Sequence, residues 1–148
     1  GFEMMEQSFK AAYLRSEQKK IAKPLVLGVT ILTSIDEANF RDLFGDIKRD
    51  LDEQVLFLAG LARSAGLDGV VASPQEIKLI KEKVGKDFIV VTPGVRPEGN
   101  DSGDQARILT PRSAIEAGAD YLVIGRPITK AKDPAKAAET IIKSMEVK

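Results

Sequence analysis

The residues best suited to bind an anion lie in the segment Gly125-Arg126-Pro127-Ile128. Gly125 lets the backbone approach a ligand closely, Arg126 offers a planar set of donors, and Pro127 suits the first turn of a helix. Because amide groups at the start of a helix attract anions, this segment predicts a phosphate clamp. The same four residues are also compatible with a surface turn that carries a solvated arginine.

A second cationic segment strengthens the phosphate interpretation. Arg96 begins a polar region in which Gln105 follows nine residues later. The irregular stretch formed by residues 93–109 has the length of a binding loop or lid, which can bring both side chains onto one ligand. Alternatively, Arg96 pairs with Asp101 or Asp104 on the surface, an interaction worth only about 0–1 kcal/mol.

Two hydroxyl residues, Thr33 and Ser34, follow the first apolar run of the sequence. At the end of a buried strand they can contact the polar edge of a ring. They can equally cap a helix that begins after them, near Asp36. The residues alone leave both interpretations open.

The elements that must position these side chains are strands alternating with helices. Four β-branched runs are continuously apolar, which is typical of buried parallel strands. They span residues 25–32, 69–72, 88–92 and 121–124. Helices are predicted over residues 2–18, 36–44, 51–65, 112–117 and 135–145, with another that begins at Ser73-Pro74. This order predicts an α/β protein built from parallel βα units.

One helix followed by four βα units is half of a (β/α)8 TIM barrel, which takes roughly 250 residues when whole. We therefore expect residues 1–148 to be the C-terminal part of a single barrel domain, with the N-terminal half absent. The alternative is a small, doubly wound sheet with helices on both faces. In a barrel, the candidate residues would meet at the carboxyl edge of the strands.

Composition narrows the chemistry further. The 22 basic and 22 acidic residues balance, so nothing favours a nucleic-acid or membrane partner. The chain has no cysteine and no histidine, so thiolates, imidazole bases and most zinc sites are excluded. Any chemistry must therefore use carboxylates, lysine, arginine, hydroxyls and backbone groups. No stretch approaches the roughly 20 consecutive apolar residues of a membrane span, and we expect a cytoplasmic protein.

Several motifs together resemble bacterial orotidine 5'-phosphate decarboxylases in order and spacing. They are Val29-Thr30-Ile31-Leu32-Thr33-Ser34, Gly66-Leu67-Asp68-Gly69-Val70-Val71, Val91-Thr92-Pro93-Gly94-Val95-Arg96-Pro97, Gly103-Asp104-Gln105 and Gly118-Ala119-Asp120-Tyr121-Leu122-Val123-Ile124-Gly125-Arg126-Pro127-Ile128. The resemblance covers essentially all 148 residues. It implies a lyase of pyrimidine (UMP) biosynthesis that removes CO2 from orotidine 5'-phosphate without cofactor or metal and works as a homodimer.

The resemblance also implies roles for individual residues. Arg126 and the amide of Gly125 would bind the 5'-phosphate, with Arg96 beside them. Gln105 would reach both the phosphate and the pyrimidine. Thr33 would lie near the pyrimidine edge.

The sequence departs from the family in one respect. The family's decarboxylating residues lie in an Asp-x-Lys-x-x-Asp motif and a preceding lysine, and that motif does not occur in these 148 residues. We therefore expect no catalytic residue in this chain, and no turnover until an N-terminal half complements it. Two alternatives stay open: a stand-alone phosphate-binding half-barrel without activity, and another barrel enzyme acting on sugar phosphates.

Overall fold

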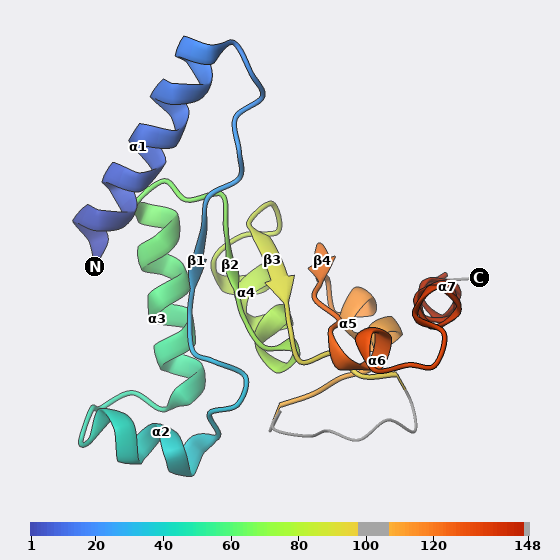
Figure 1. The fold of residues 1–148 in the computed structure, drawn as a ribbon. Coiled ribbons are helices and arrows are strands. Elements are labelled where there is room, and N and C mark those ends of the chain that lie inside the picture. Colours follow the sequence, from blue (N-terminus) through green and yellow to red (C-terminus); the bar gives the residue numbers. More distant parts are fainter. Residues whose placement is uncertain (98–106, 147–148) are drawn as a thin grey trace.

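The computed structural model describes residues 1–97 and 107–146, which fold around a four-stranded parallel sheet (Figure 1). The strands lie in sequence order and are β1 (Leu27–Val29), β2 (Gly69–Val71), β3 (Ile89–Thr92) and β4 (Tyr121–Leu122). Gly28 pairs with Val70, and Val70 pairs with Val90. Neighbouring strands are joined through helices, as predicted for parallel βα units.

Strands β1 and β4 are shorter than the sequence suggested. Hydrogen bonding nevertheless continues past β1, because the amide of Thr30 donates to Val71 at 3.1 Å. The amide of Val123 likewise donates to Thr92 at 2.9 Å, beyond the end of β4. Both strands lie at an edge of the described sheet, where only one neighbour supports regular pairing.

Four of the α-helices begin directly after a residue whose side chain caps them. The helical elements are α1 (Phe2–Lys19), α2 (Glu37–Phe44), α3 (Leu51–Ser64), the 3-10 turn η1 (Pro74–Glu76), α4 (Ile77–Lys83), α5 (Pro111–Glu116), α6 (Arg126–Thr129) and α7 (Pro134–Met145). Asp36, Asp50, Thr110 and Asp133 each accept a hydrogen bond from a backbone amide in the first turn. Asp50 and Glu53 form a reciprocal capping box at the start of α3.

Among the described residues, helices cover one face of the sheet and leave the other face open (Figure 1). A side chain at Gly28 would meet Ala62 and Leu67 at 3.3 Å, so this face packs closely on α3 and the turn after it. Val29, Tyr121 and Val123 are more than half exposed. A doubly wound sheet would carry helices on both faces, so the one-sided cover favours the half-barrel.

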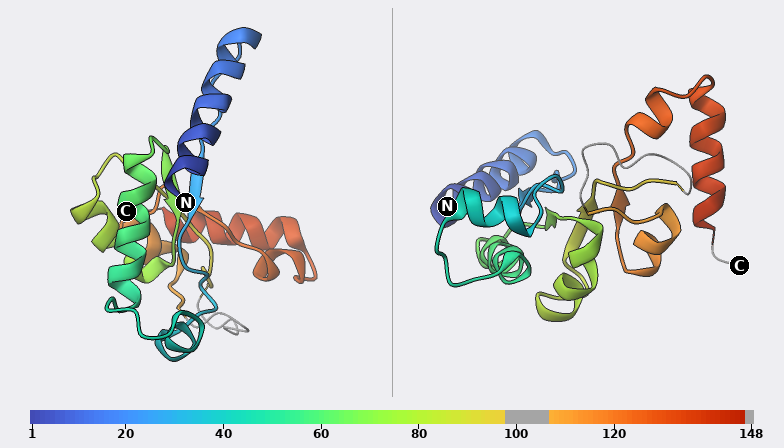
Figure 2. Two further views of the ribbon diagram at one scale, coloured as in Figure 1. Left: turned by 90° about the vertical axis from the view of Figure 1, so that its left-hand side faces the viewer. Right: turned by 90° about the horizontal axis from the view of Figure 1, so that it is seen from below.

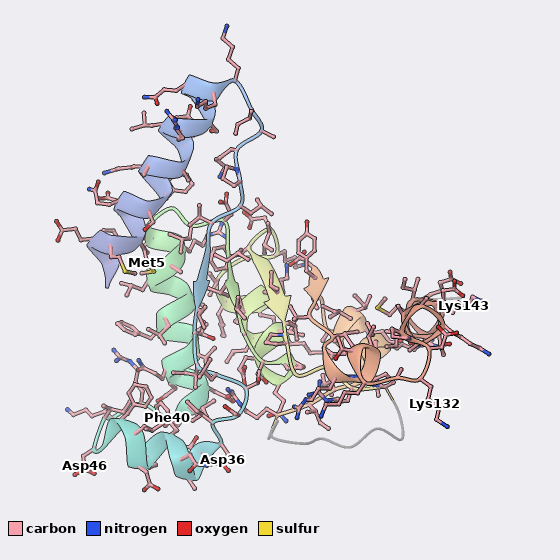
Figure 3. All side chains as sticks on the ribbon, in the orientation of Figure 1. Met5, Asp36, Phe40, Asp46, Lys132 and Lys143 are labelled. Atoms are coloured by element: carbon pink, nitrogen blue, oxygen red, sulfur yellow. The ribbon has the colours of Figure 1, made fainter. Side chains whose placement is uncertain are left out.

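The core lies between the sheet and helices α3, α4 and α5. Val55, Val70, Ile77, Val90 and Ala114 are fully buried there. The core extends to α2 through its fully buried aromatic ring, Phe40 (Figure 3). Helix α1 contacts α3 through its first half and projects beyond the rest of the fold (Figure 2).

Two aspartates stabilise the amino edge of the sheet in the same way. Asp68, just before β2, accepts from the Val26 amide at 2.8 Å and pairs with Lys23. Asp120, just before β4, accepts from the Val90 amide at 2.7 Å and pairs with Lys81. Each carboxylate thereby ties its own strand to the preceding one at the edge opposite the candidate site.

Candidate functional site

Four of the five predicted site residues follow strand ends at the carboxyl edge of the sheet. Thr33 lies beyond β1, Arg96 beyond β3, and Gly125 with Arg126 beyond β4. Because the strands are parallel, their carboxyl ends share one edge. The fifth, Gln105, lies outside the described residues, as do Asp101 and Asp104, the alternative partners of Arg96.

The Gly125-Arg126 segment opens onto solvent. Arg126 begins the single helical turn α6, in which the amides of Ile128 and Thr129 donate to the Gly125 carbonyl at 2.9 and 3.0 Å. A side chain placed at Gly125 would meet no atom of the described residues within 4 Å. Both residues are exposed. The backbone here is therefore open to a ligand, as an anion-binding turn requires.

Arg96, in contrast, is held against the protein. Its side chain is 8% exposed and donates through Nη1 to the Val95 carbonyl at 2.8 Å. Its amide donates to the Leu109 carbonyl at 3.0 Å, beside a parallel bridge between Val95 and Leu109. The two segments that flank residues 98–106 are thus hydrogen-bonded to each other.

The loops after β3 and β4 meet, as the phosphate prediction requires. Pro97, next to Arg96, and Pro127, next to Arg126, line the same cavity of about 350 Å3. Helix α7, which contributes Lys136, and its capping residue Asp133 supply the remaining wall. The two arginines are therefore carried by adjoining loops.

Thr33 is 7% exposed and lies two residues beyond the buried Ile31. Helix α2 is capped by Asp36, whose side chain accepts from the Asn39 amide at 2.9 Å. The capping alternative for Thr33 and Ser34 is therefore wrong.

The structure adds two buried residues that sequence reasoning missed, Glu76 and Arg107. Arg107 Nη1 donates to Glu76 Oε1, and Nη2 donates to the Leu32 carbonyl at 3.0 Å. Their side chains are 1% and 7% exposed. Burial raises the pKa of Glu76 from 4.5 to about 7, although the positive charge of Arg107 opposes this rise.

The sequence does contain a pattern that involves Glu76, but this pattern predicts a helix cap and not a buried ion pair. Glu76 follows Ser73 by three residues, which is the spacing of a capping box. Ser73 does accept from a backbone amide of η1, that of Gln75. No comparable signal marks Arg107, which lies 31 residues from Glu76.

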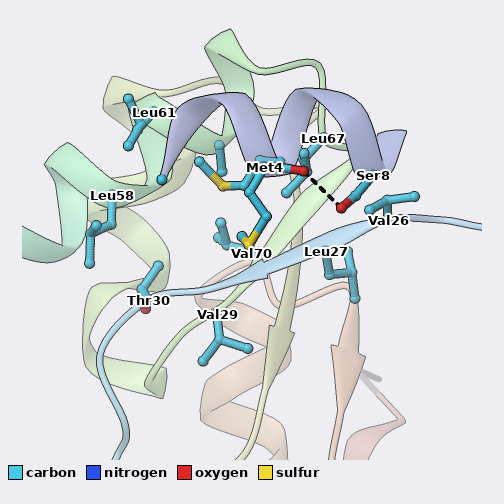
Figure 4. Close-up of a pocket in the computed structure, with 14 residues that line it drawn as sticks. Met4, Ser8, Val26, Leu27, Val29, Thr30, Leu58, Leu61, Leu67 and Val70 are labelled. Atoms are coloured by element: carbon cyan, nitrogen blue, oxygen red, sulfur yellow. Dashed lines mark hydrogen bonds between the residues drawn. The ribbon is translucent and has the colours of Figure 1, made fainter. Parts of the chain in front are cut away.

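Another cavity, of about 450 Å3, lies between α1, β1 and α3 (Figure 4). Its walls are mostly apolar side chains, among them Met4, Leu58 and Val70, and no charged side chain lines it. Within residues 1–97 and 107–146, no group of three or more acidic side chains is arranged to hold a metal ion. No helix in the same part of the chain is long and apolar enough to cross a membrane.

These features define a parallel α/β protein of the barrel class, with cationic and hydroxyl residues gathered at the carboxyl edge of its strands. A family model described as "Orotidine 5'-phosphate decarboxylase / HUMPS family" matches residues 1–141. The chain belongs to this family.

Individual relatives agree with the family match. A protein of Moorella thermoacetica named orotidine 5'-phosphate decarboxylase is 52% identical over 139 residues, covering 93% of this chain and 55% of its own length. A protein of the same name from Pseudoalteromonas translucida is 48% identical over 146 residues, covering 99% of this chain and 60% of its own length. The chain thus spans about 55–60% of these relatives.

Solved structures confirm the predicted fold class. The orotidine 5'-phosphate decarboxylase of Lactobacillus acidophilus superimposes with a TM-score of 0.81 at 37% identity, covering 99% of this chain and 60% of that one. An uncharacterized conserved protein from Geobacillus kaustophilus superimposes with a TM-score of 0.77 at 35% identity, with the same coverage.

Proposed function

We propose that this chain supplies the phosphate- and nucleotide-binding part of an orotidine 5'-phosphate decarboxylase, which releases CO2 to form uridine 5'-phosphate (UMP). The observation that carries the proposal is the meeting of two arginine-bearing loops after β3 and β4, with Pro97 and Pro127 lining one cavity. Membership of the family supports the same assignment.

In this proposal the residues bind different parts of the substrate. Arg126 and the Gly125 amide bind the 5'-phosphate, Arg96 lies beside them, and Gln105 joins from the loop to reach phosphate and pyrimidine. Thr33 contacts the pyrimidine edge. A phosphate dianion suits this set, because arginine donors to phosphate form charge-assisted hydrogen bonds.

Binding the phosphate can raise the rate only if it stabilises the transition state more than the bound substrate. Contacts remote from the reacting carbon do so when they help close the site and orient the ring. This is the contribution that we assign to the chain, as a substrate-binding part without a catalytic residue of its own.

We further propose that residues 1–148 form the C-terminal part of a single barrel domain. No Asp-x-Lys-x-x-Asp motif occurs among them, so we infer that turnover needs residues that this sequence does not contain. The exposed sheet face at Val29, Tyr121 and Val123 is suited to packing against a complementing N-terminal half. The assembled enzyme is expected to be a cytoplasmic homodimer.

The first experiment is calorimetry with UMP on the chain alone and with the N-terminal part of the Moorella thermoacetica relative added. Turnover of orotidine 5'-phosphate is measured in the same samples. The proposal requires that UMP binds. It also requires that orotidine 5'-phosphate is turned over only in the complemented assembly. Binding without turnover in any assembly would favour a stand-alone half-barrel. Equal affinity for UMP and simple sugar phosphates would favour another barrel enzyme.

Arg126→Ala tests the phosphate clamp in the complemented assembly. Loss of one charged hydrogen bond costs about 1.5–3 kcal/mol, so kcat/KM is expected to fall at least roughly tenfold. Arg112→Ala is the matched control, because Arg112 pairs with Glu116 on the exposed surface of α5. A change below twofold for Arg126→Ala would remove this residue from the clamp.

A further inference from the structure

The buried pair of Glu76 and Arg107 joins three separate segments at the carboxyl edge of the sheet. Glu76 ends the turn that follows β2, and Arg107 lies between the 98–106 segment and α5. Arg107 also donates to the carbonyls of Leu32 at 3.0 Å and Ile31 at 3.4 Å, beyond β1. One guanidinium therefore fixes the relative positions of all three.

Stability alone does not account for this pair. Taking two charges out of water is expensive, and apolar residues of similar size often stabilise a fold as well or better. Within the described part of the chain, Glu76 Oε2 and Arg107 Nε have no hydrogen-bond partner that would offset this cost. A positional role explains the arrangement better than a stabilising one.

The contacts of Arg107 connect the two ends of the proposed substrate site. Leu32, whose carbonyl accepts from Arg107, immediately precedes Thr33 on the pyrimidine side. Leu109, two residues after Arg107, accepts from the Arg96 amide on the phosphate side at 3.0 Å. The segment 107–109 thus bridges the backbone that carries Thr33 and the backbone that carries Arg96.

We propose that Glu76 and Arg107 form a positioning pair that sets the separation between the pyrimidine-binding and phosphate-binding ends of the site. This inference rests on the proposed function. The pair acts through Thr33 and Arg96 and does not touch the substrate. Ligands that span both ends should depend on the pair, whereas a ligand that occupies only the phosphate end should not.

The decisive variant replaces both members, as Glu76→Met with Arg107→Met. It removes both buried charges together and keeps side chains of similar length, so the urea midpoint is expected to equal or exceed that of wild type. In the complemented assembly, UMP affinity is expected to fall at least roughly tenfold, which corresponds to about 1.4 kcal/mol. Inorganic phosphate, which reaches only one end, should bind within twofold of wild type.

Two further variants keep the test informative if the double variant fails to fold. Glu76→Gln retains the shape of the side chain and Arg107→Lys retains a donor for Leu32, so both should lose less UMP affinity than Arg107→Met. A double-mutant cycle with Thr33→Val tests whether the pair acts through Thr33. If it does, Arg107→Met should cost little further UMP affinity in a chain that already carries Thr33→Val. Arg63→Met is the control, because Arg63 pairs with Asp87 away from these segments and its side chain is 41% exposed.

Each outcome separates this inference from the proposed function. If wild type does not bind UMP in the complemented assembly, the proposed function fails and the positioning role fails with it. If wild type binds UMP and the folded double variant binds it within twofold, only the positioning role is overturned. An equal loss of UMP and inorganic phosphate affinity would also overturn it, because the effect would then lie at the phosphate end alone.

Discussion

The pH dependence of stability should be dominated by Glu76 between pH 5 and pH 8. The pKa of its carboxyl is raised from 4.5 to about 7, first by burial, against the opposing charge of Arg107 and with a smaller contribution from Asp52. The chain contains no histidine, which is the side chain that ordinarily titrates in this range. The effect of Glu76 can therefore be observed with little interference.

The sign follows from proton binding. Between pH 4.5 and about 7, the unfolded chain loses the Glu76 proton while the folded chain retains it. The free energy of unfolding must then decrease as pH rises, and the decrease is complete above about pH 7. At 1.36 kcal/mol per pH unit the whole effect is about 3 kcal/mol, of which roughly 2–3 kcal/mol falls between pH 5 and pH 8.

Urea unfolding followed by circular dichroism at pH 5, 6, 7 and 8 measures this quantity. Glu76→Gln should remove the decrease, matching wild type at pH 5 and exceeding its stability by roughly 2–3 kcal/mol at pH 8. Asp87→Asn is the control, because hydrogen bonds from Arg63 hold the pKa of Asp87 below its ordinary 3.8, outside the window. A flat wild-type profile, or the same slope in Glu76→Gln, would refute the reasoning.

Two further predictions concern how the fold is held together, and both are measured by urea unfolding at pH 7. Asp50→Ala removes the capping box of α3 and should cost about 0.5–2 kcal/mol, whereas Asp46→Ala, at an exposed position, should change stability by less than about 0.5 kcal/mol. Asp120→Asn weakens the acceptor shared by Lys81 and the Val90 amide and should cost about 1–3 kcal/mol. Equal stability of Asp120→Asn and wild type would show that β3 and β4 are not joined through this carboxylate.

Local features of the fold were predictable because their causes are local in sequence. Continuous β-branched runs predicted all four strands, and Asp36 marked the start of a helix that it does cap. Strand lengths were less predictable, since pairing at β1 and β4 depends on which neighbours an edge strand has. The choice between a barrel and a doubly wound sheet likewise needed the three-dimensional arrangement.

The candidate site divides in the same way. The sequence by itself determined which residue types follow the strand ends, and parallel strands bring Thr33, Arg96 and Arg126 to one edge by topology alone. Only the tertiary structure decided that Arg96 is buried and that Arg107 reaches across 31 residues to Glu76. The energy of a buried ion pair depends on desolvation and on partners distant in sequence, which no local pattern encodes.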